Sequence, residues 1–184
     1  MEAKQEEEVA PKPPRYEARF AALADFDFVE GGKMKVLDAE NIDSATLDLQ
    51  KEAELTRNAI TNNNILIAAC DNEPVGYIWF VISDQTPFGL GTYGPWTNKL
   101  AWISFSYVSE AWRRKGVGTF LYQQVEAYCR KEGIKEVQLD VYLCNSRSLS
   151  FHESMGYTPY LQIYSKTVLP ALSSSQLPVN KQNT

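Results

Sequence analysis

Apolar positions recur along the chain with two different periods, and the changes of period divide it into elements. Alternating or continuous apolar runs, which are typical of strands, cover residues 16–22, 65–70, 75–83, 100–108, 136–142 and part of 160–168. Spacings of three and four, which are typical of helices, cover residues 25–38, 44–62, 116–132 and 146–155. This order, β-α-α-β-β-β-α-β-α-β, predicts an α+β or mixed α/β sheet with helices on both faces.

Several finer expectations follow from the same pattern. Residues 71–74 should turn the strand 65–70 into an antiparallel hairpin with 75–83, and Asp25 should cap the helix 25–38. The helix 116–132 should bury a stripe made of Val117, Leu121, Val125 and Tyr128. Simple alternation in the strand 100–108 places Ile103, Phe105 and Tyr107 on one face and Trp102, Ser104, Ser106 and Val108 on the other.

The segments between and beyond these elements have other compositions. Residues 1–14 are rich in Glu, Lys and Pro and residues 169–184 in Ser, Pro, Asn and Gln, so both are expected to be solvated tails around one domain over 15–168. Residues 84–98 are rich in Gly, Pro, Thr and aromatics and are too long for a tight turn. A specificity loop and a packed surface excursion are equally consistent with that stretch.

Composition narrows the class of protein. The chain has 184 residues and a formal net charge of −5, which argues against a nucleic-acid-binding face. Residues 1–14 are not expected to act as a signal peptide, because they are acidic and contain proline, and no apolar run is long enough to span a membrane. Its three cysteines, Cys70, Cys129 and Cys144, lack metal-ligand spacing and are expected to pack as small apolar residues. A reduced, cytoplasmic location is expected.

One turn carries the clearest chemical signal. Arg113, Arg114 and Lys115 precede Gly116 and Gly118, which open the helix 116–132 without a capping side chain. Such a helix start leaves backbone N–H groups free to hold an anion. A dinucleotide-binding turn is disfavoured because the third glycine position is Leu121. This motif alone does not exclude a purely structural glycine loop.

The surrounding residues make the signal more specific. The run from Val108 through Arg113 to Gly118 resembles the acyl-CoA loop, Arg/Gln-x-x-Gly-x-Gly/Ala, of the GNAT acetyltransferase superfamily. Asp140 within a strand, then Asn145, then His152 and Gly156-Tyr157 resemble the family's next strand, asparagine, helix and Gly-Phe ending, at matching spacing. The resemblance covers about residues 16–168 and implies a GNAT fold with about six to seven strands.

The resemblance also implies a donor and its binding residues. Acetyl-CoA would be the acyl donor, and its pyrophosphate would lie on the glycine turn, where missing side chains let the backbone approach. The residues expected to bind the donor are Val108, Arg113, Arg114, Gly116, Gly118, Thr119 and Asn145. Asn145 would bond the pantetheine or brace the loop before its helix, and no metal is expected.

Three positions are carried over as candidate catalytic groups. Val108 corresponds to the backbone N–H that stabilises the oxyanion where the strands splay. Asp140 occupies the place of a general-base glutamate, with a solvated or ion-paired acid as the alternative. His152, the only histidine, replaces the family's tyrosine acid and could protonate the leaving thiolate, with a packed histidine as the alternative.

The implied activity is transfer of an acetyl group from acetyl-CoA directly to a primary amine. The acceptor stays open between a small cationic amine, such as a polyamine, aminoglycoside or amino acid, and a protein α-amine or lysine. A different class is a catalytically degenerate acyl-CoA sensor or interaction subunit with the same fold. Neither nucleic acid nor membrane is expected as a partner, and the oligomeric state is open, with a homodimer as one option.

Overall fold

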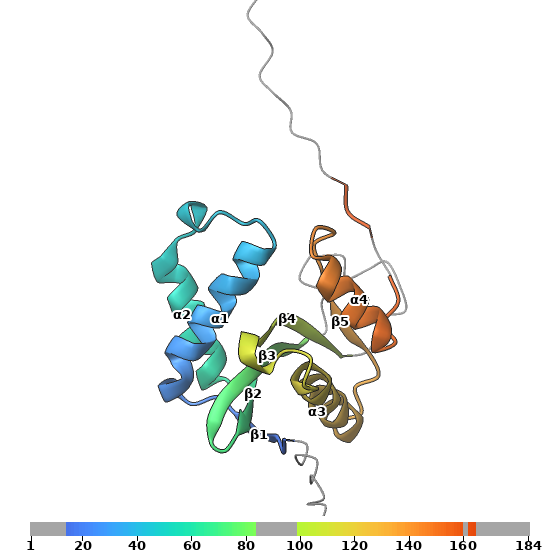
Figure 1. Ribbon diagram of the computed structural model, residues 1–184. Helices are drawn as coiled ribbons and strands as arrows, with labels where there is room; N and C mark the ends of the chain where they lie inside the picture. Colours follow the sequence, from blue (N-terminus) through green and yellow to red (C-terminus); the bar gives the residue numbers. More distant parts are fainter. Residues whose placement is uncertain (1–13, 84–98, 160–161, 165–184) are drawn as a thin grey trace, which may run out of the picture.

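The computed structural model describes residues 14–83, 99–159 and 162–164 of the 184 (Figure 1). Among these residues, one five-stranded sheet runs in the order β1-β2-β3-β4-β5 and is antiparallel except for the parallel pair β4–β5. The strands are β1 (Glu17–Phe20), β2 (Ile65–Cys70), β3 (Glu73–Ser83), β4 (Leu100–Val108) and β5 (Val137–Leu139). The mixed sheet confirms the predicted fold class with slightly fewer strands than expected.

Four predicted segments fall wholly or mostly outside the described residues. They are the tails 1–14 and 169–184, the loop 84–98 and the last strand within 160–168. Pro14 and residues 162–164 are described, and they have no regular structure.

Helices cover both faces of the sheet, as the element order predicts. The helices α1 (Phe26–Ala39) and α2 (Leu49–Thr61) lie on one side, and α3 (Val117–Lys131) and α4 (Ser146–Ser154) on the other (Figure 1). Each face has its own apolar cluster. Val29, Ile65, Ile67 and Tyr77 belong to the α1–α2 side, whereas Ile78, Leu121 and Val125 belong to the α3 side.

Several element boundaries differ from those predicted. The hairpin turns over Asp71 and Asn72 alone, both with positive φ, because paired left-handed residues match the twist of the strands they join. Asp25 does not cap α1 with its side chain, since its carboxylate accepts from Arg19 and from the Ala22 N–H. A 3₁₀ turn over Ser44–Thr46 precedes α2, and β5 is much shorter than 136–142.

A β-bulge corrects the predicted faces of β4. Trp79 pairs with Phe105 and Phe80 with Ile103, so Ser104 is an extra residue in β4. The bulge breaks the alternation: Ile103 packs with the α3 side, whereas Phe105 and Tyr107 pack with the α1–α2 side. Ser106 and Val108 consequently face α3.

The buried positions of α3 and of the cysteines also differ in part from expectation. Val117, Leu121 and Val125 are buried as predicted, but Tyr122 and Cys129 complete the buried stripe, while Tyr128 is half-buried. Cys70 and Cys129 are buried, as expected of small apolar side chains. Cys144 is exposed, because it lies in the loop between β5 and α4 rather than inside the fold.

Candidate functional site

The glycine turn lies between the end of β4 and the start of α3. A 3₁₀ turn over Glu110–Trp112 is followed by extended Arg113, and then Arg114 and Gly116 both have positive φ, at 59° and 88°. No side chain caps α3 at Gly116, as the sequence predicts, and the first N–H groups of a helix have no partner within the helix itself. Arg113, Arg114 and Lys115 are exposed around them. Backbone donors and exposed cations together suit a phosphate-bearing ligand.

Residues preceding β1 hold this turn in place. The Tyr16 hydroxyl donates to the Lys115 carbonyl at 2.8 Å, and its ring contacts Trp112 and Phe120 with centroid distances of 6.2 and 5.7 Å. Lys115 Nζ lies 5.1 Å from the centroid of the Trp112 ring. The turn is therefore fixed by the fold before any ligand arrives, which lowers the entropic cost of binding.

The two glycines of the turn are required for different reasons. Gly116 has open space around its missing side chain, but its φ of 88° would strain any other residue. Gly118 has ordinary helical geometry, and a Cβ there would lie 3.3 Å from the Phe151 ring of α4. Gly116 thus shapes the turn, whereas Gly118 lets α3 and α4 approach each other.

The strands β4 and β5 separate beside this turn, and we call the gap between them the splay. Their pairing covers only residues 101–103 of β4 and 137–139 of β5. The Ser109 N–H donates to the Val75 carbonyl of β3, so alternation directs the N–H groups of Ser106 and Val108 away from β3, toward the splay. The Val108 carbonyl accepts from Arg113 Nε at 3.2 Å on that side. A backbone donor therefore points into the gap where the resemblance expects one.

Asp140 directly follows β5 and lies near a second acid. It is exposed, yet partial desolvation raises the pKa of its carboxyl group. Burial first, and then the charge of Asp140, raise the pKa of Glu40, the residue that ends α1. Asn145 opposes this shift through a hydrogen bond to Glu40. The end of α1 and the loop after β5 thus present two carboxylates whose ionised forms are disfavoured.

His152 lies on α4 with only 7% of its surface exposed. Its Nε2 is 2.6 Å from the Tyr122 hydroxyl of α3, and that hydroxyl is 3.2 Å from Ser106 Oγ of β4. Burial lowers the pKa of His152 and raises that of Tyr122 to about 12. The imidazole is consequently neutral at pH 7. The prediction from the sequence, that His152 acts as an acid, used the ordinary pKa of histidine.

The residues before α4 have structural partners of their own. The Asn145 side chain accepts from the Ser148 N–H at 3.2 Å and so caps α4, which is the bracing role allowed for it. The Cys144 thiol lies 3.8 Å from the Glu40 carbonyl. Both contacts join the loop after β5 to neighbouring helices.

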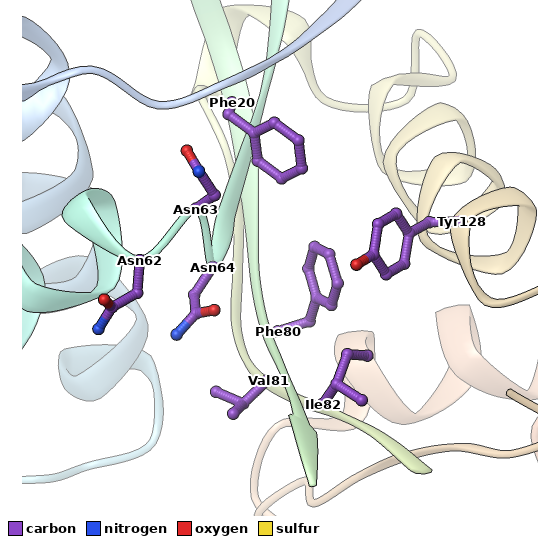
Figure 2. A pocket seen from close by; sticks show the side chains of 8 residues that line it. All are labelled: Phe20, Asn62, Asn63, Asn64, Phe80, Val81, Ile82 and Tyr128. Atoms are coloured by element: carbon purple, nitrogen blue, oxygen red, sulfur yellow. The ribbon is translucent and has the colours of Figure 1, made fainter. Parts of the chain in front are cut away.

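A surface hollow of about 480 Å³ lies between Tyr128 of α3 and the loop that follows α2 (Figure 2). Tyr128, in the last turns of α3, is about 16 Å along the helix from Val117, at a rise of about 1.5 Å per residue. The hollow is therefore distinct from the glycine turn. Its lining residues are Phe20, Asn62, Asn63, Asn64, Phe80, Val81, Ile82 and Tyr128.

The structure brings the sequence-predicted residues together in two groups. Val108, Arg113, Arg114, Gly116, Gly118 and Thr119 all lie on the turn or the splayed end of β4, and Asp140 and Asn145 lie across the splay after β5. His152 joins them only through Tyr122 and Ser106. Sequence reasoning missed two residues: Tyr122, whose spacing from Val125 fitted the buried stripe, and Glu40, which no pattern distinguished.

The family model described as the acetyltransferase (GNAT) family matches residues 35–157. The chain therefore belongs to the GNAT acetyltransferase family. Within the described residues, no helix is long and apolar enough to cross a membrane, and no cluster of His, Cys, Asp and Glu is arranged to hold a metal ion.

Individual proteins resemble the chain over part of their length. Aminoglycoside N(6')-acetyltransferase type 1 of Klebsiella aerogenes is 33% identical over 100 residues, covering 54% of this chain and 62% of that protein. Phosphinothricin N-acetyltransferase of Streptomyces viridochromogenes is 33% identical over 87 residues, covering 45% and 48%. The match thus spans roughly half the length of these curated relatives.

Solved structures share the fold. A predicted acetyltransferase from Clostridium acetobutylicum, determined with acetyl-CoA, superposes with a TM-score of 0.60 at 17% identity, over 83% of this chain and 96% of that one. At this identity the likeness concerns the fold alone.

Proposed function

We propose that this chain transfers the acetyl group of acetyl-CoA to a primary amine. The observation that carries the proposal is the uncapped, glycine-shaped start of α3, ringed by exposed cations and adjoining the splayed end of β4. The turn would hold the pyrophosphate through the N–H groups of residues 116–119, with Arg113 and Arg114 adding charge. The Val108 N–H would donate to the developing oxyanion.

Two titratable groups are proposed to move protons. Asp140 would accept a proton from the substrate ammonium, because its partial desolvation favours protonation, and water can bridge the short side chain to the amine. His152 would return a proton to the leaving thiolate, since a thiol is a weaker acid than imidazolium.

A small cationic amine is the proposed acceptor. Glu40 lies at the end of α1 and Asp140 directly after β5, and the charge of Asp140 raises the pKa of Glu40 after the larger effect of burial. A bound cation would relieve this repulsion, which favours an ammonium over a neutral acceptor. The amine-acetylating relatives support the same class of acceptor. We also propose a cytoplasmic location, because acetyl-CoA is an intracellular donor and the thiols of Cys70 and Cys129 are free.

Donor binding is tested by thermal unfolding with acetyl-CoA, free CoA and NAD. A ligand at 100 times its Kd should add about 2.7 kcal/mol of stability. We expect stabilisation by both CoA species and none by NAD. Stabilisation by NAD alone would contradict the assignment of the turn.

Turnover is tested by thiol release with a panel comprising an aminoglycoside, a polyamine, phosphinothricin and an N-terminal peptide. Activity on a small amine supports the proposed acceptor class, and activity confined to the peptide contradicts it. Tight CoA binding without release on any amine would instead indicate an acyl-CoA sensor.

A further inference from the structure

Four polar side chains from three elements form one hydrogen-bonded line through the α3 side of the molecule. Ser106 Oγ of β4 is 3.2 Å from the Tyr122 hydroxyl of α3, which is 2.6 Å from His152 Nε2 of α4. His152 Nδ1 lies 3.4 Å from Ser148 Oγ at the other end. We call Ser106, Tyr122, His152 and Ser148 the Tyr122 chain.

The direction of the hydrogen bonds follows from the surroundings of Ser148. The Ser148 N–H donates to Asn145. The backbone group of Ser148 that favours protonated His152 is therefore its carbonyl, which can only accept a hydrogen bond. His152 therefore carries its proton on Nδ1 and accepts at Nε2. Tyr122 donates to Nε2, and Ser106 in turn donates to the Tyr122 oxygen.

The hydrogen bonds are donated in one direction, from Ser106 at the splay toward His152 in the interior. Ser106 is half-buried at the splayed end of β4, whereas Tyr122 is 2% exposed and His152 is 7% exposed. A proton that enters at Ser106 Oγ can be relayed to His152 Nε2, because Ser106 and Tyr122 each pass their own hydroxyl proton onward. The chain is arranged to take up a proton first and to return it afterwards.

Acetylation of an ammonium substrate releases two protons from nitrogen. The first must leave before attack, because only the neutral amine has a lone pair. The second leaves while the new C–N bond forms, and the departing thiolate needs one when the C–S bond breaks. A single group that stores the second proton and gives it to sulfur balances the reaction.

We propose that Ser106, Tyr122 and His152 form a proton shuttle that carries this second proton from the acceptor nitrogen to the leaving sulfur. The inference rests on the acetyltransferase function proposed above and adds to it a role for Tyr122. In this scheme Asp140 passes the first proton to solvent. His152 becomes imidazolium for the interval between the two transfers, and Tyr122 is a positioning residue that links it to Ser106.

The local electrostatics suit a temporary store. The titratable groups facing His152 are the phenols of Tyr122 on α3 and of Tyr157 after α4, and His152 has no ion pair among the described residues. Burial lowers the pKa of His152, so the ring is neutral at rest and gives up an acquired proton readily.

The test compares phenol removals within one aromatic cluster. Tyr122→Phe keeps the ring but breaks the line of hydrogen bonds, whereas Tyr157→Phe removes a hydroxyl from a ring whose centroid is 5.9 Å from that of Tyr122. We expect Tyr122→Phe to lower kcat about 10- to 100-fold, within the range for proton-transfer catalysis, with the KM for acetyl-CoA within about twofold of wild type. Tyr157→Phe should leave kcat near wild type.

A second set of variants tests the entrance of the shuttle. Ser106→Ala should lose activity as Tyr122→Phe does, and Ser106→Thr should restore much of it because the hydroxyl is kept. Ser104→Ala, at the neighbouring bulge, serves as the control. A kcat for Tyr122→Phe equal to that of Tyr157→Phe, in an active wild-type enzyme, overturns the shuttle alone. An inactive wild-type enzyme overturns the acetyltransferase proposal instead.

Discussion

Each face of the sheet buries a polar cluster. The two clusters differ in charge and in whether they extend to the splay between β4 and β5. On the α1–α2 side, Lys33 is fully buried, and its Nζ contacts Glu30 at 3.0 Å, Glu52 at 3.3 Å and Thr56 at 2.9 Å. We call these four residues the Lys33 network. On the α3 side, the Tyr122 chain contains no charged side chain in its resting form and begins at Ser106 beside the splay.

The difference indicates two kinds of task. In the Lys33 network an ammonium is balanced by two carboxylates, and its contacts with Glu52 and Thr56 join α1 to α2. Such an arrangement fixes the two helices against each other, because removing one partner leaves a buried charge unbalanced. The Tyr122 chain has a basic nitrogen, His152 Nε2, at its inner end and the Ser106 hydroxyl at the splay. We therefore expect variants of the Tyr122 chain to affect turnover and variants of the Lys33 network to affect stability.

The largest effect is expected from His152→Ala. Loss of the imidazole should lower kcat by roughly 10- to 1000-fold, the range for general acid–base groups, while acetyl-CoA binding changes little. His152→Tyr should retain more activity than the alanine variant, because a phenol can donate its own proton to sulfur but cannot store one as imidazolium does. Steady-state kinetics with the best amine provides the measurement. A wild-type kcat for the alanine variant would remove His152 from the mechanism.

Lys33→Ala should give the largest change in stability. Removing the ammonium leaves two neighbouring carboxylates unbalanced, and partial hydration of Glu30 and Glu52, which are 20% and 25% exposed, softens the effect. We expect a loss of about 2–3 kcal/mol in the free energy of unfolding, measured by urea denaturation. Lys35→Ala, which removes an exposed lysine from the same helix, is the control. If Lys33→Ala lowered kcat at saturating substrates while the free energy of unfolding stayed near that of the wild type, the division between the clusters would be wrong.

The sequence predicted best what depends on local geometry. The turn at Gly116 was recognisable because glycines, cations and the absent cap are consecutive in the chain. The hairpin and β4 followed from apolar runs whose ends coincide with polar residues. His152 was found by its place in a motif, although its burial and neutral state were not.

What the sequence did not predict depends on contacts between distant residues. Tyr122 meets His152 across 30 positions, and only the packing of α3 against α4 brings them together. The bulge at Ser104 has no glycine or proline to mark it, so period-two alternation assigned Ile103 to the wrong face. Glu40 lies near Asp140 because α1 ends beside the loop after β5.

A smaller and opposite change is expected beside the Lys33 network. The Tyr77 hydroxyl is the one buried side-chain polar atom without a hydrogen-bond partner among the residues that the structure describes, and burial raises the pKa of this phenol strongly. Tyr77→Phe should therefore stabilise the protein by about 1 kcal/mol, because a desolvated, unpaired group is removed. Tyr107→Phe is the matched control, since its hydroxyl accepts from Lys35 and should not give the same gain. Urea denaturation of both variants provides the measurement, and destabilisation by Tyr77→Phe would indicate a partner for that hydroxyl.

The smallest effect is the pH dependence of stability that His152 contributes. Burial lowers its pKa in the folded state, so the unfolded chain binds a proton more readily and stability falls as pH drops below about 6.5. Glu40 and Asp140 oppose this trend, because their pKa values are raised by folding and protonation then favours the folded state. Comparison with His152→Tyr isolates the histidine, which is the only one in the chain. The wild-type protein should lose more stability between pH 7 and pH 5.5 than the variant, by at most about 1.4 kcal/mol per pH unit. Equal slopes would mean that His152 is not desolvated. The contrast in charge between the Tyr122 chain and the Lys33 network would then be weaker than the structure indicates.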